Sequence, residues 1–109
     1  MGIRSIESDY VNTVDGIIVA LCKDYERREN AIRNKSFSSR TSMEYEYINS
    51  KIREAAREIV GDEADKYVNE IGDRVGYAYS EVMTASESTY KKVKKEIKIN
   101  IARKLHMID

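Results

Sequence analysis

The sequence predicts an all-α fold, a small helical domain of about four helices, and three observations lead to this fold class. The chain has 109 residues, which is enough for one domain with a modest core. It contains no proline, five glycines and 35 % charged residues, a composition typical of helical proteins. Apolar residues also recur every three or four positions in four separate segments.

The first segment carries one helical stripe. Its members are Ile3, Ile6, Tyr10, Val14, Ile17, Leu21, Tyr25 and Ile32. A continuous helix over residues 3–32 would be about 45 Å long, so we expect it either to bend or to pack on a second copy of the chain. The apolar face around Ile17, Ile18, Val19 and Leu21 is wide enough for a homodimer interface, which places possible dimerisation in residues 1–60.

Residues 34–42 are polar and serine-rich and are predicted to form a loop. Thr41 followed by Glu44 matches a capping box, which would start a second helix that runs to about Val60. Gly61 is expected to end this helix as a left-handed cap. The apolar stripe of this helix is Ile48, Ile52, Ala55 and Ile59.

Asp62 is predicted to start a third, shorter helix. Its apolar face would be Ala64, Val68, Ile71 and Val75. A fourth helix follows, with Thr84 or Ser86 as its N-cap, because either hydroxyl can accept from the free amides of the first turn. Its stripe is Tyr90, Val93, Ile97, Ile101 and Leu105.

Positive charge is concentrated in this last helix, although the chain has 19 basic and 19 acidic residues overall. With Tyr90, Val93 and Ile97 towards the core, other side chains would lie exposed in the first turns, as in a helix that enters the major groove of DNA. These are Ser88, Lys91, Lys92 and Lys95. Lys94, Lys98 and Arg40 would then be peripheral phosphate contacts. A solvated lysine-rich surface is the alternative.

The string SESTYKKVKKEI, residues 86–97, resembles the start of the recognition helix in region 4 of bacterial sigma factors. Together with Gly76, Tyr77 and the closing Ile101, Ala102 and Leu105, it resembles the ArpU/RinA type of phage and prophage transcriptional regulators. This resemblance implies a C-terminal helix-turn-helix-like DNA-binding unit over residues 62–109. Ten residues separate Tyr77 from Ser88, so either the turn is long or a short helix around residues 79–83 intervenes.

The resemblance implies a regulator that binds double-stranded DNA, with RNA polymerase or another host protein as a further partner. The chain has one cysteine, Cys22, so no intrachain disulfide can form, and a cytoplasmic setting is expected. Two alternatives stay open. One is a small helical interaction module, such as an inhibitor or adaptor of a host protein. The other is a small terminase-like subunit for DNA packaging, which would form a large ring.

Residues that bear catalytic or metal chemistry are few. Cys22 continues an apolar run and is expected to be a core thiol, and His106 is expected to meet the free carbonyls at a helix end. The two lack zinc-site spacing, and the sequence holds no glycine-rich phosphate loop. We therefore expect no enzyme activity, no metal and no cofactor. The longest apolar run, Ile17 to Cys22, predicts no membrane span.

Overall fold

Five α-helices and two single 3₁₀ turns make up the computed structural model, which describes residues 10–35, 38–82 and 86–109. The helices are α1 (Asn12–Lys23), α2 (Tyr25–Asn34), α3 (Ser39–Val60), α4 (Ala64–Gly72) and α5 (Glu87–Lys104), and the 3₁₀ turns are η2 (Gly61–Glu63) and η3 (Tyr77–Tyr79). No strand occurs in these ranges, so the predicted all-α fold class is confirmed.

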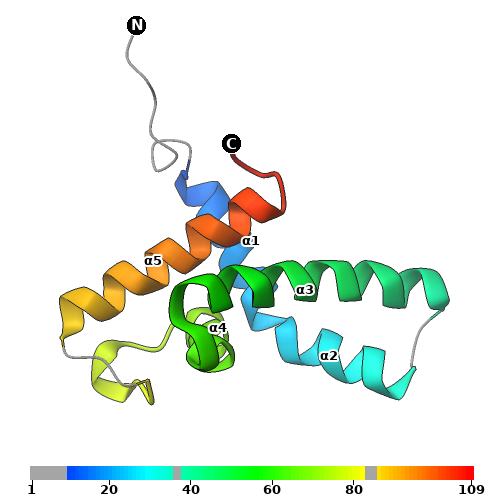
Figure 1. Ribbon diagram of the computed structural model, residues 1–109, viewed down its shortest axis with the longest axis horizontal. Helices are drawn as coiled ribbons and strands as arrows, with labels where there is room; N and C mark the ends of the chain where they lie inside the picture. Colours follow the sequence, from blue (N-terminus) through cyan, green and yellow to red (C-terminus); the bar gives the residue numbers. More distant parts are fainter. Residues whose placement is uncertain (1–9, 36–37, 83–85) are drawn as a thin grey trace, which may run out of the picture.

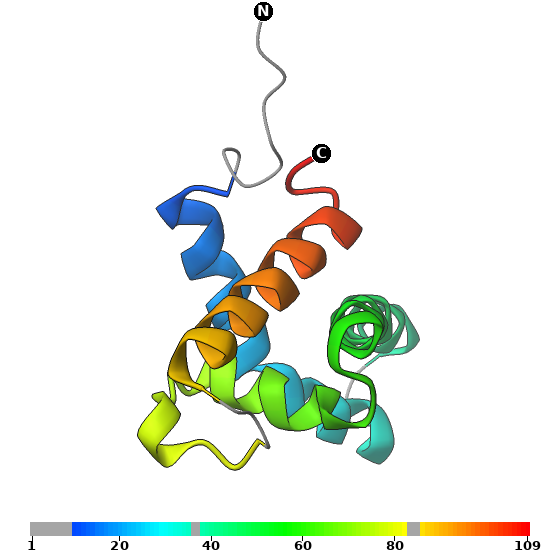
Figure 2. The same ribbon diagram turned by 60° about the vertical axis from the view of Figure 1, so that its left-hand side comes forward.

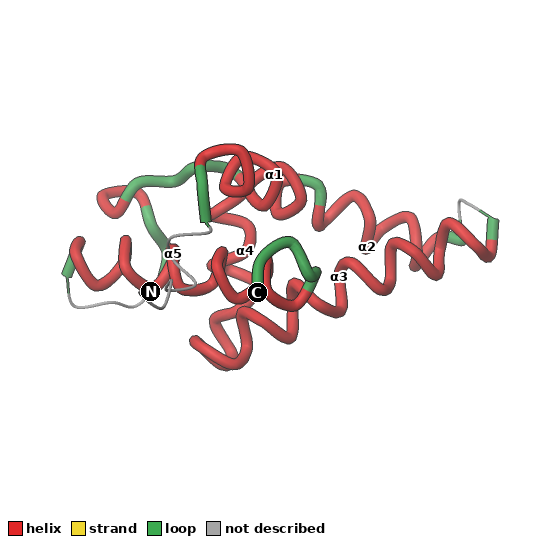
Figure 3. The backbone as a smooth tube through the Cα atoms, turned by 90° about the horizontal axis from the view of Figure 1, so that it is seen from above, coloured by secondary structure: helices red, strands yellow, loops and turns green. Residues whose placement is uncertain are grey.

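The central element is α3, which packs against α2, α4 and α5 (Figure 1). Figure 2 shows α5 crossing α1, with α4 beneath the two of them. The other end of the molecule is an antiparallel hairpin of α2 and the first half of α3, which extends away from the body (Figure 3). The molecule is flattened, with principal extents of 44 × 39 × 22 Å.

The core lies where α1, α3, α4 and α5 meet. Its buried members are Ile18, Val19, Cys22, Tyr25, Ile52, Ala55, Ala56, Ala64, Tyr67, Val68, Ile71, Val82, Tyr90, Ile97, Ile101 and Ala102. The buried side of α1 differs from the predicted stripe by about one residue. Ile17 is 44 % exposed, whereas Ile18 and Cys22 are fully buried. Cys22 is thus the core thiol that the sequence predicts.

The first helical segment was expected either to bend or to pack on a second copy, and it bends. Asp24 divides it into α1 and α2. The Asp24 carboxylate accepts hydrogen bonds from Arg27 and Arg28 of the next helix. Arg28 is itself buried and donates to the Leu21 carbonyl of α1 and to Asn49 Oδ1 of α3, the latter at 2.6 Å. These bonds satisfy the buried guanidinium and fix the angle between the two helices.

The start of α3 differs from the sequence prediction. Ser38 is the N-cap, and its side chain accepts from the Thr41 amide at 3.3 Å. The predicted capping box of Thr41 and Glu44 is therefore wrong, because Thr41 lies inside the first turn. The loop is shorter than the predicted residues 34–42 for the same reason.

The end of α3 follows the prediction in part. Gly61 ends the helix with a φ of +61°, a region that favours glycine. Its ψ of −125° is not that of a left-handed helical cap. The chain continues into the 3₁₀ turn η2, so α4 begins at Ala64 rather than directly after Asp62.

Both ends of α5 are capped. Ser86 accepts from the Thr89 amide at 3.2 Å, which makes Ser86 the N-cap; Thr84 lies outside the described residues. At the other end His106 has a φ of +60° and its amide donates to the Arg103 carbonyl, while the Met107 amide donates to Ala102. This is the Schellman arrangement, in which the backbone amide of His106 satisfies a free carbonyl; the interaction expected of its side chain stays a prediction.

Candidate nucleic-acid interface

The first turns of α5 are held to the body by Tyr90, which is 1 % exposed. Its hydroxyl donates to Glu70 Oε1 at 2.6 Å, and its ring lies beside the rings of Tyr67 and Tyr77, with centroids at 5.9 and 5.8 Å. The sequence places Tyr90 in the core stripe but does not identify these partners. The start of α5 therefore has a defined position relative to α4.

Glu70 is a buried carboxylate that sequence reasoning missed. It accepts from Ser80 Oγ at 2.7 Å and from the Glu81 amide at 2.8 Å, as well as from Tyr90. Burial alone would raise the pKa of Glu70, but these hydrogen bonds outweigh burial and lower it. Burial and the bond to Glu70 together raise the pKa of Tyr90 to about 12. A carboxylate directly before Ile71 in an apolar stripe is the only sequence signal for it.

The four residues predicted to face a groove are exposed in the first turns of α5. They are Ser88, Lys91, Lys92 and Lys95. Within the part of the chain that the structure describes, Lys91 has one ion pair, with Glu87 at 3.5 Å, and neither Lys92 nor Lys95 has a partner. The exposed face ends near residue 96, because Ile99 and Ala102 further along the same side are buried.

Lys94 and Lys98, expected as peripheral phosphate contacts, are engaged inside the molecule. Lys94 Nζ donates to the Val75 carbonyl at 2.8 Å and lies 4.8 Å from the centre of the Tyr90 ring. Lys98 forms an ion pair with Asp15 of α1 at 2.7 Å, and its side chain is only 21 % exposed. Burial, together with the neighbouring charge of Lys98, lowers the pKa of Lys94. A phosphate could reach either ammonium only by competing with these contacts.

Arg40 does not belong to the same surface. Its side chain is 91 % exposed, with an ion pair to Glu44 at 3.5 Å. It lies in the first turn of α3, at the tip of the α2–α3 hairpin, at the opposite end of the long axis from the start of α5 (Figure 1). The structure thus separates Arg40 from the lysines with which the sequence analysis grouped it.

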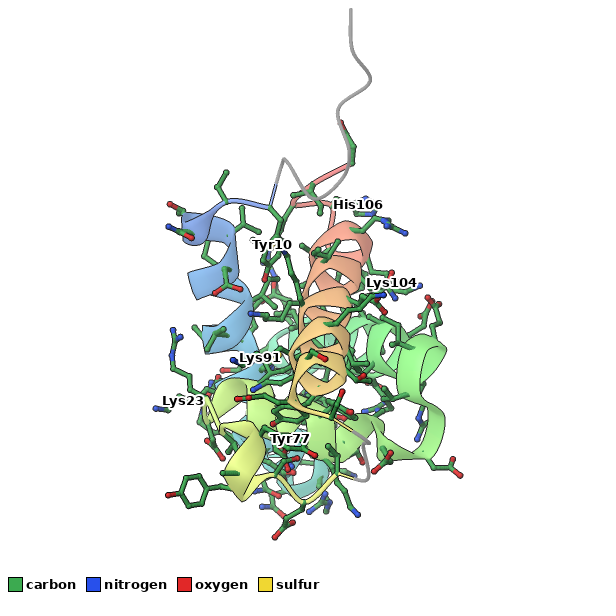
Figure 4. All side chains as sticks on the ribbon, turned by 90° about the vertical axis from the view of Figure 1, so that its left-hand side faces the viewer. Tyr10, Lys23, Tyr77, Lys91, Lys104 and His106 are labelled. Atoms are coloured by element: carbon green, nitrogen blue, oxygen red, sulfur yellow. The ribbon has the colours of Figure 1, made fainter. Side chains whose placement is uncertain are left out.

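A pocket of about 410 Å³ opens between the start of α1 and one side of α5. It is lined by Tyr10, Asn12, Asp15, Lys91, Lys94, Lys95 and Lys98. Figure 4 places Tyr10 and Lys91 on the side of α5 that faces α1. Asp15 accepts from Tyr10 Oη at 3.0 Å and from Lys98 Nζ. Burial would raise the pKa of Asp15, but the bonds from Lys98 and Tyr10 lower it.

The connection between α4 and α5 is long. It covers residues 73–86 and contains the 3₁₀ turn η3 at Tyr77–Tyr79, slightly before the short helix expected at residues 79–83. In a helix-turn-helix the two helices are joined by about 3–4 residues. Here α5 packs mainly along α3 and α1, and the Tyr90 network joins its first turn to α4.

No protein-family model matches the chain, and neither a curated protein nor a solved structure shows significant similarity to it. The class of protein must therefore be argued from the site. Among the described residues, no cluster of three or more histidine, cysteine, aspartate or glutamate side chains is arranged to hold a metal ion. Each helix in the described ranges is too short or too polar to cross a bilayer.

Proposed function

We propose that the protein binds double-stranded DNA through the first turns of α5 and acts in transcriptional control. The main support for the proposal is that one face of α5 exposes Ser88, Lys91, Lys92 and Lys95. Tyr90 on the opposite face is hydrogen-bonded to Glu70 and fixes the helix to the body. An α-helix fits the major groove, and lysines there neutralise backbone phosphates more than they distinguish bases.

The fixed start of α5 supports this proposal. An interface helix must hold its lysines in one position if they are to meet phosphates at a defined spacing along the duplex. Tyr90, buried between Tyr67 and Tyr77 and bonded to Glu70, supplies that support. Ser86 caps the helix, so the start of the lysine face does not depend on bound DNA for its backbone hydrogen bonds.

The proposal also includes a regulatory role of the phage type and a contact with RNA polymerase, which rest on the resemblance of residues 62–109. It includes cytoplasmic action, which rests on the single cysteine. A homodimer also belongs to it. Ile17 in the middle of α1 is 44 % exposed, and Val11, the N-cap residue, is 53 % exposed, which supports a contact along this helix. The face available is narrower than the sequence suggests, because Ile18 and Val19 fill the core of the monomer itself.

Substitution of the exposed lysines tests the proposal. We expect the double variant Lys91→Ala/Lys92→Ala to bind a fluorescent duplex at least tenfold more weakly. The slope of log affinity against log salt should become shallower by about two, since each phosphate contact contributes about −0.9. Fluorescence anisotropy across a salt series measures both quantities.

Arg40→Ala is the matched control, because it also removes an exposed cation, at the far end of the molecule. We expect it to change the affinity by less than about twofold. If the double variant bound DNA as tightly as the wild type, α5 would not be the contact surface. Equal losses in both variants would indicate diffuse attraction instead.

A second candidate function is a helical module that binds another protein. Met43 and Tyr47 on α3 are 70 % and 49 % exposed, and with Glu44 and Ile48 they line a shallow hollow of about 470 Å³. Exposed apolar groups on a projecting hairpin favour a protein contact. Met43→Ser/Tyr47→Ser would abolish such a contact and leave DNA binding unchanged. A DNA-packaging ring, the third alternative, is distinguished by its large native mass.

A further inference from the structure

Four lysines of α5 form a stripe on the side of the helix that faces α1. Lys91, Lys94, Lys95 and Lys98 are spaced i, i+3, i+4 and i+7, which places them along one line on a helix surface. All four line the pocket between α1 and α5. Its volume of about 410 Å³ falls within the roughly 300–1,000 Å³ typical of small-molecule sites.

The described lining of this pocket carries more positive than negative charge. Among the described residues, Asp15 is the one carboxylate in the lining, against four ammonium groups. The first residue of α1, Asn12, also lines the pocket, and the N-cap residue Val11 has no side chain that could accept from the first-turn amides. The positive end of the α1 dipole adds to the lysine charges.

The four lysines differ in their contacts within the protein. Lys98 is bound to Asp15 and Lys94 to the Val75 carbonyl, whereas Lys95 has no partner in the described ranges and Lys91 has only the 3.5 Å pair with Glu87. Two ammonium groups are thus available at the mouth of the pocket, and the inner two are held in place by the protein. Such a site would bind an anion with little rearrangement.

We propose that the α1–α5 pocket binds a single phosphate group, with Lys91 and Lys95 as its main ligands and Asp15 as the internal competitor for Lys98. The phosphate has two sources with the same chemistry. If the phosphate belongs to the DNA backbone, the inference rests on the proposed function, and the pocket would extend the DNA-contact surface of α5 towards α1. As a free phosphate or phosphate monoester it requires no DNA.

Inorganic phosphate is the probe that tests the pocket itself. We expect saturable changes in the ¹H–¹⁵N resonances of the Asn12 and Asp15 amides as phosphate replaces chloride at constant ionic strength. Lys95→Gln should weaken this binding about tenfold, as expected for the loss of one charge-assisted hydrogen bond. Arg103→Gln is the matched control, because Arg103 is also an exposed cation on α5 and lies outside the pocket lining. It should leave the affinity unchanged.

Asp15→Asn should change the phosphate affinity in the opposite direction to Lys95→Gln. The amide keeps the shape of the side chain and removes the negative charge that the described lining places beside the lysines, so phosphate should bind at least threefold more tightly. A role in folding alone would not produce tighter binding. Thermal unfolding of each variant shows whether it retains the fold, and Lys95→Gln tests the site even if Asp15→Asn is unstable.

Three results would contradict the proposal that the pocket binds phosphate. They are the absence of saturable shifts beyond those in chloride, equal losses in Arg103→Gln and Lys95→Gln, and unchanged affinity in a folded Asp15→Asn variant. Titration with a short duplex then separates the sources. Phosphate binding without duplex binding would support the pocket and contradict the proposed function. The protein could instead bind the duplex without shifts of the Asn12 and Asp15 amides and without binding inorganic phosphate. That result would support the proposed function and contradict the pocket.

Discussion

At the residue scale, the position of the candidate interface depends on one buried carboxylate. Glu70 is 8 % exposed and receives three hydrogen bonds, from Ser80, the Glu81 amide and Tyr90. A buried charge is stable only when hydrogen bonds replace its lost hydration, as they do here. Glu70 therefore fixes both the chain that leads into α5 and the first turn of α5.

Glu70→Gln should destabilise the protein by about 1–3 kcal/mol, because the amide nitrogen cannot accept the hydrogen bonds that the carboxylate oxygens accept. Urea unfolding measures this cost. Glu81→Gln is the control, since only the backbone amide of Glu81 takes part in the network, and it should change stability by less than about 0.5 kcal/mol. Equal effects of the two substitutions would show that the network does not hold the connection.

The same group predicts a dependence on pH. The folded protein lowers the pKa of Glu70 below that of the unfolded chain, so the folded state favours the ionised form. Its contribution is present above the ordinary pKa of glutamate and is lost as the pH falls through the lowered value. The wild type should therefore lose more stability than Glu70→Gln between neutral and acidic pH. Parallel pH profiles would contradict this assignment.

At the scale of the elements, α1 and α4 approach closely at Gly72. A Cβ atom built there would lie 2.5 Å from Lys23 Cα of α1, closer than any side chain tolerates. The position therefore requires glycine because of packing, and not because of its backbone angles. Gly16, also within a helix, has nothing within 4 Å of such an atom.

The two glycines should respond with opposite signs to the same substitution. We expect Gly72→Ala to destabilise by about 1–3 kcal/mol through overpacking against backbone. Gly16→Ala should stabilise by roughly 0.5–1 kcal/mol, because alanine is the better helix former. Thermal unfolding of both variants is the measurement. Stabilisation by Gly72→Ala would mean that α1 and α4 are not in contact at this point.

Helical periodicity predicts the elements well wherever one side of a helix meets the core. The exposure of Ser88, Lys91, Lys92 and Lys95 follows from the burial of Tyr90 and Ile97 on the other side of α5. Periodicity fails where the outcome depends on distant segments. The buried side of α1 is set by α4, and the internal contact of Lys98 is set by Asp15, far away in sequence. The pocket could not be predicted for the same reason.

At the scale of the whole molecule, the two candidate surfaces lie at opposite ends of the long axis (Figure 1). The start of α5, which carries Lys91, Lys92 and Lys95, lies at one end of the long axis, and the α2–α3 hairpin extends from the other (Figure 1). A duplex that meets the start of α5 would therefore leave the hairpin free for a protein contact. This separation lets the two candidate surfaces be tested independently, because substitutions on one are remote from the other.

The measurement that tests the central claim most directly is binding of the wild-type protein to a fluorescent duplex over a salt series, with light scattering on the same sample. The three exposed lysines predict affinity that falls with a log–log slope of about −3 for a monomer, and about twice that for a dimer. Absence of binding even at ~50 mM salt would contradict the account, and the apolar surface of α3 would then be the leading candidate for the functional site.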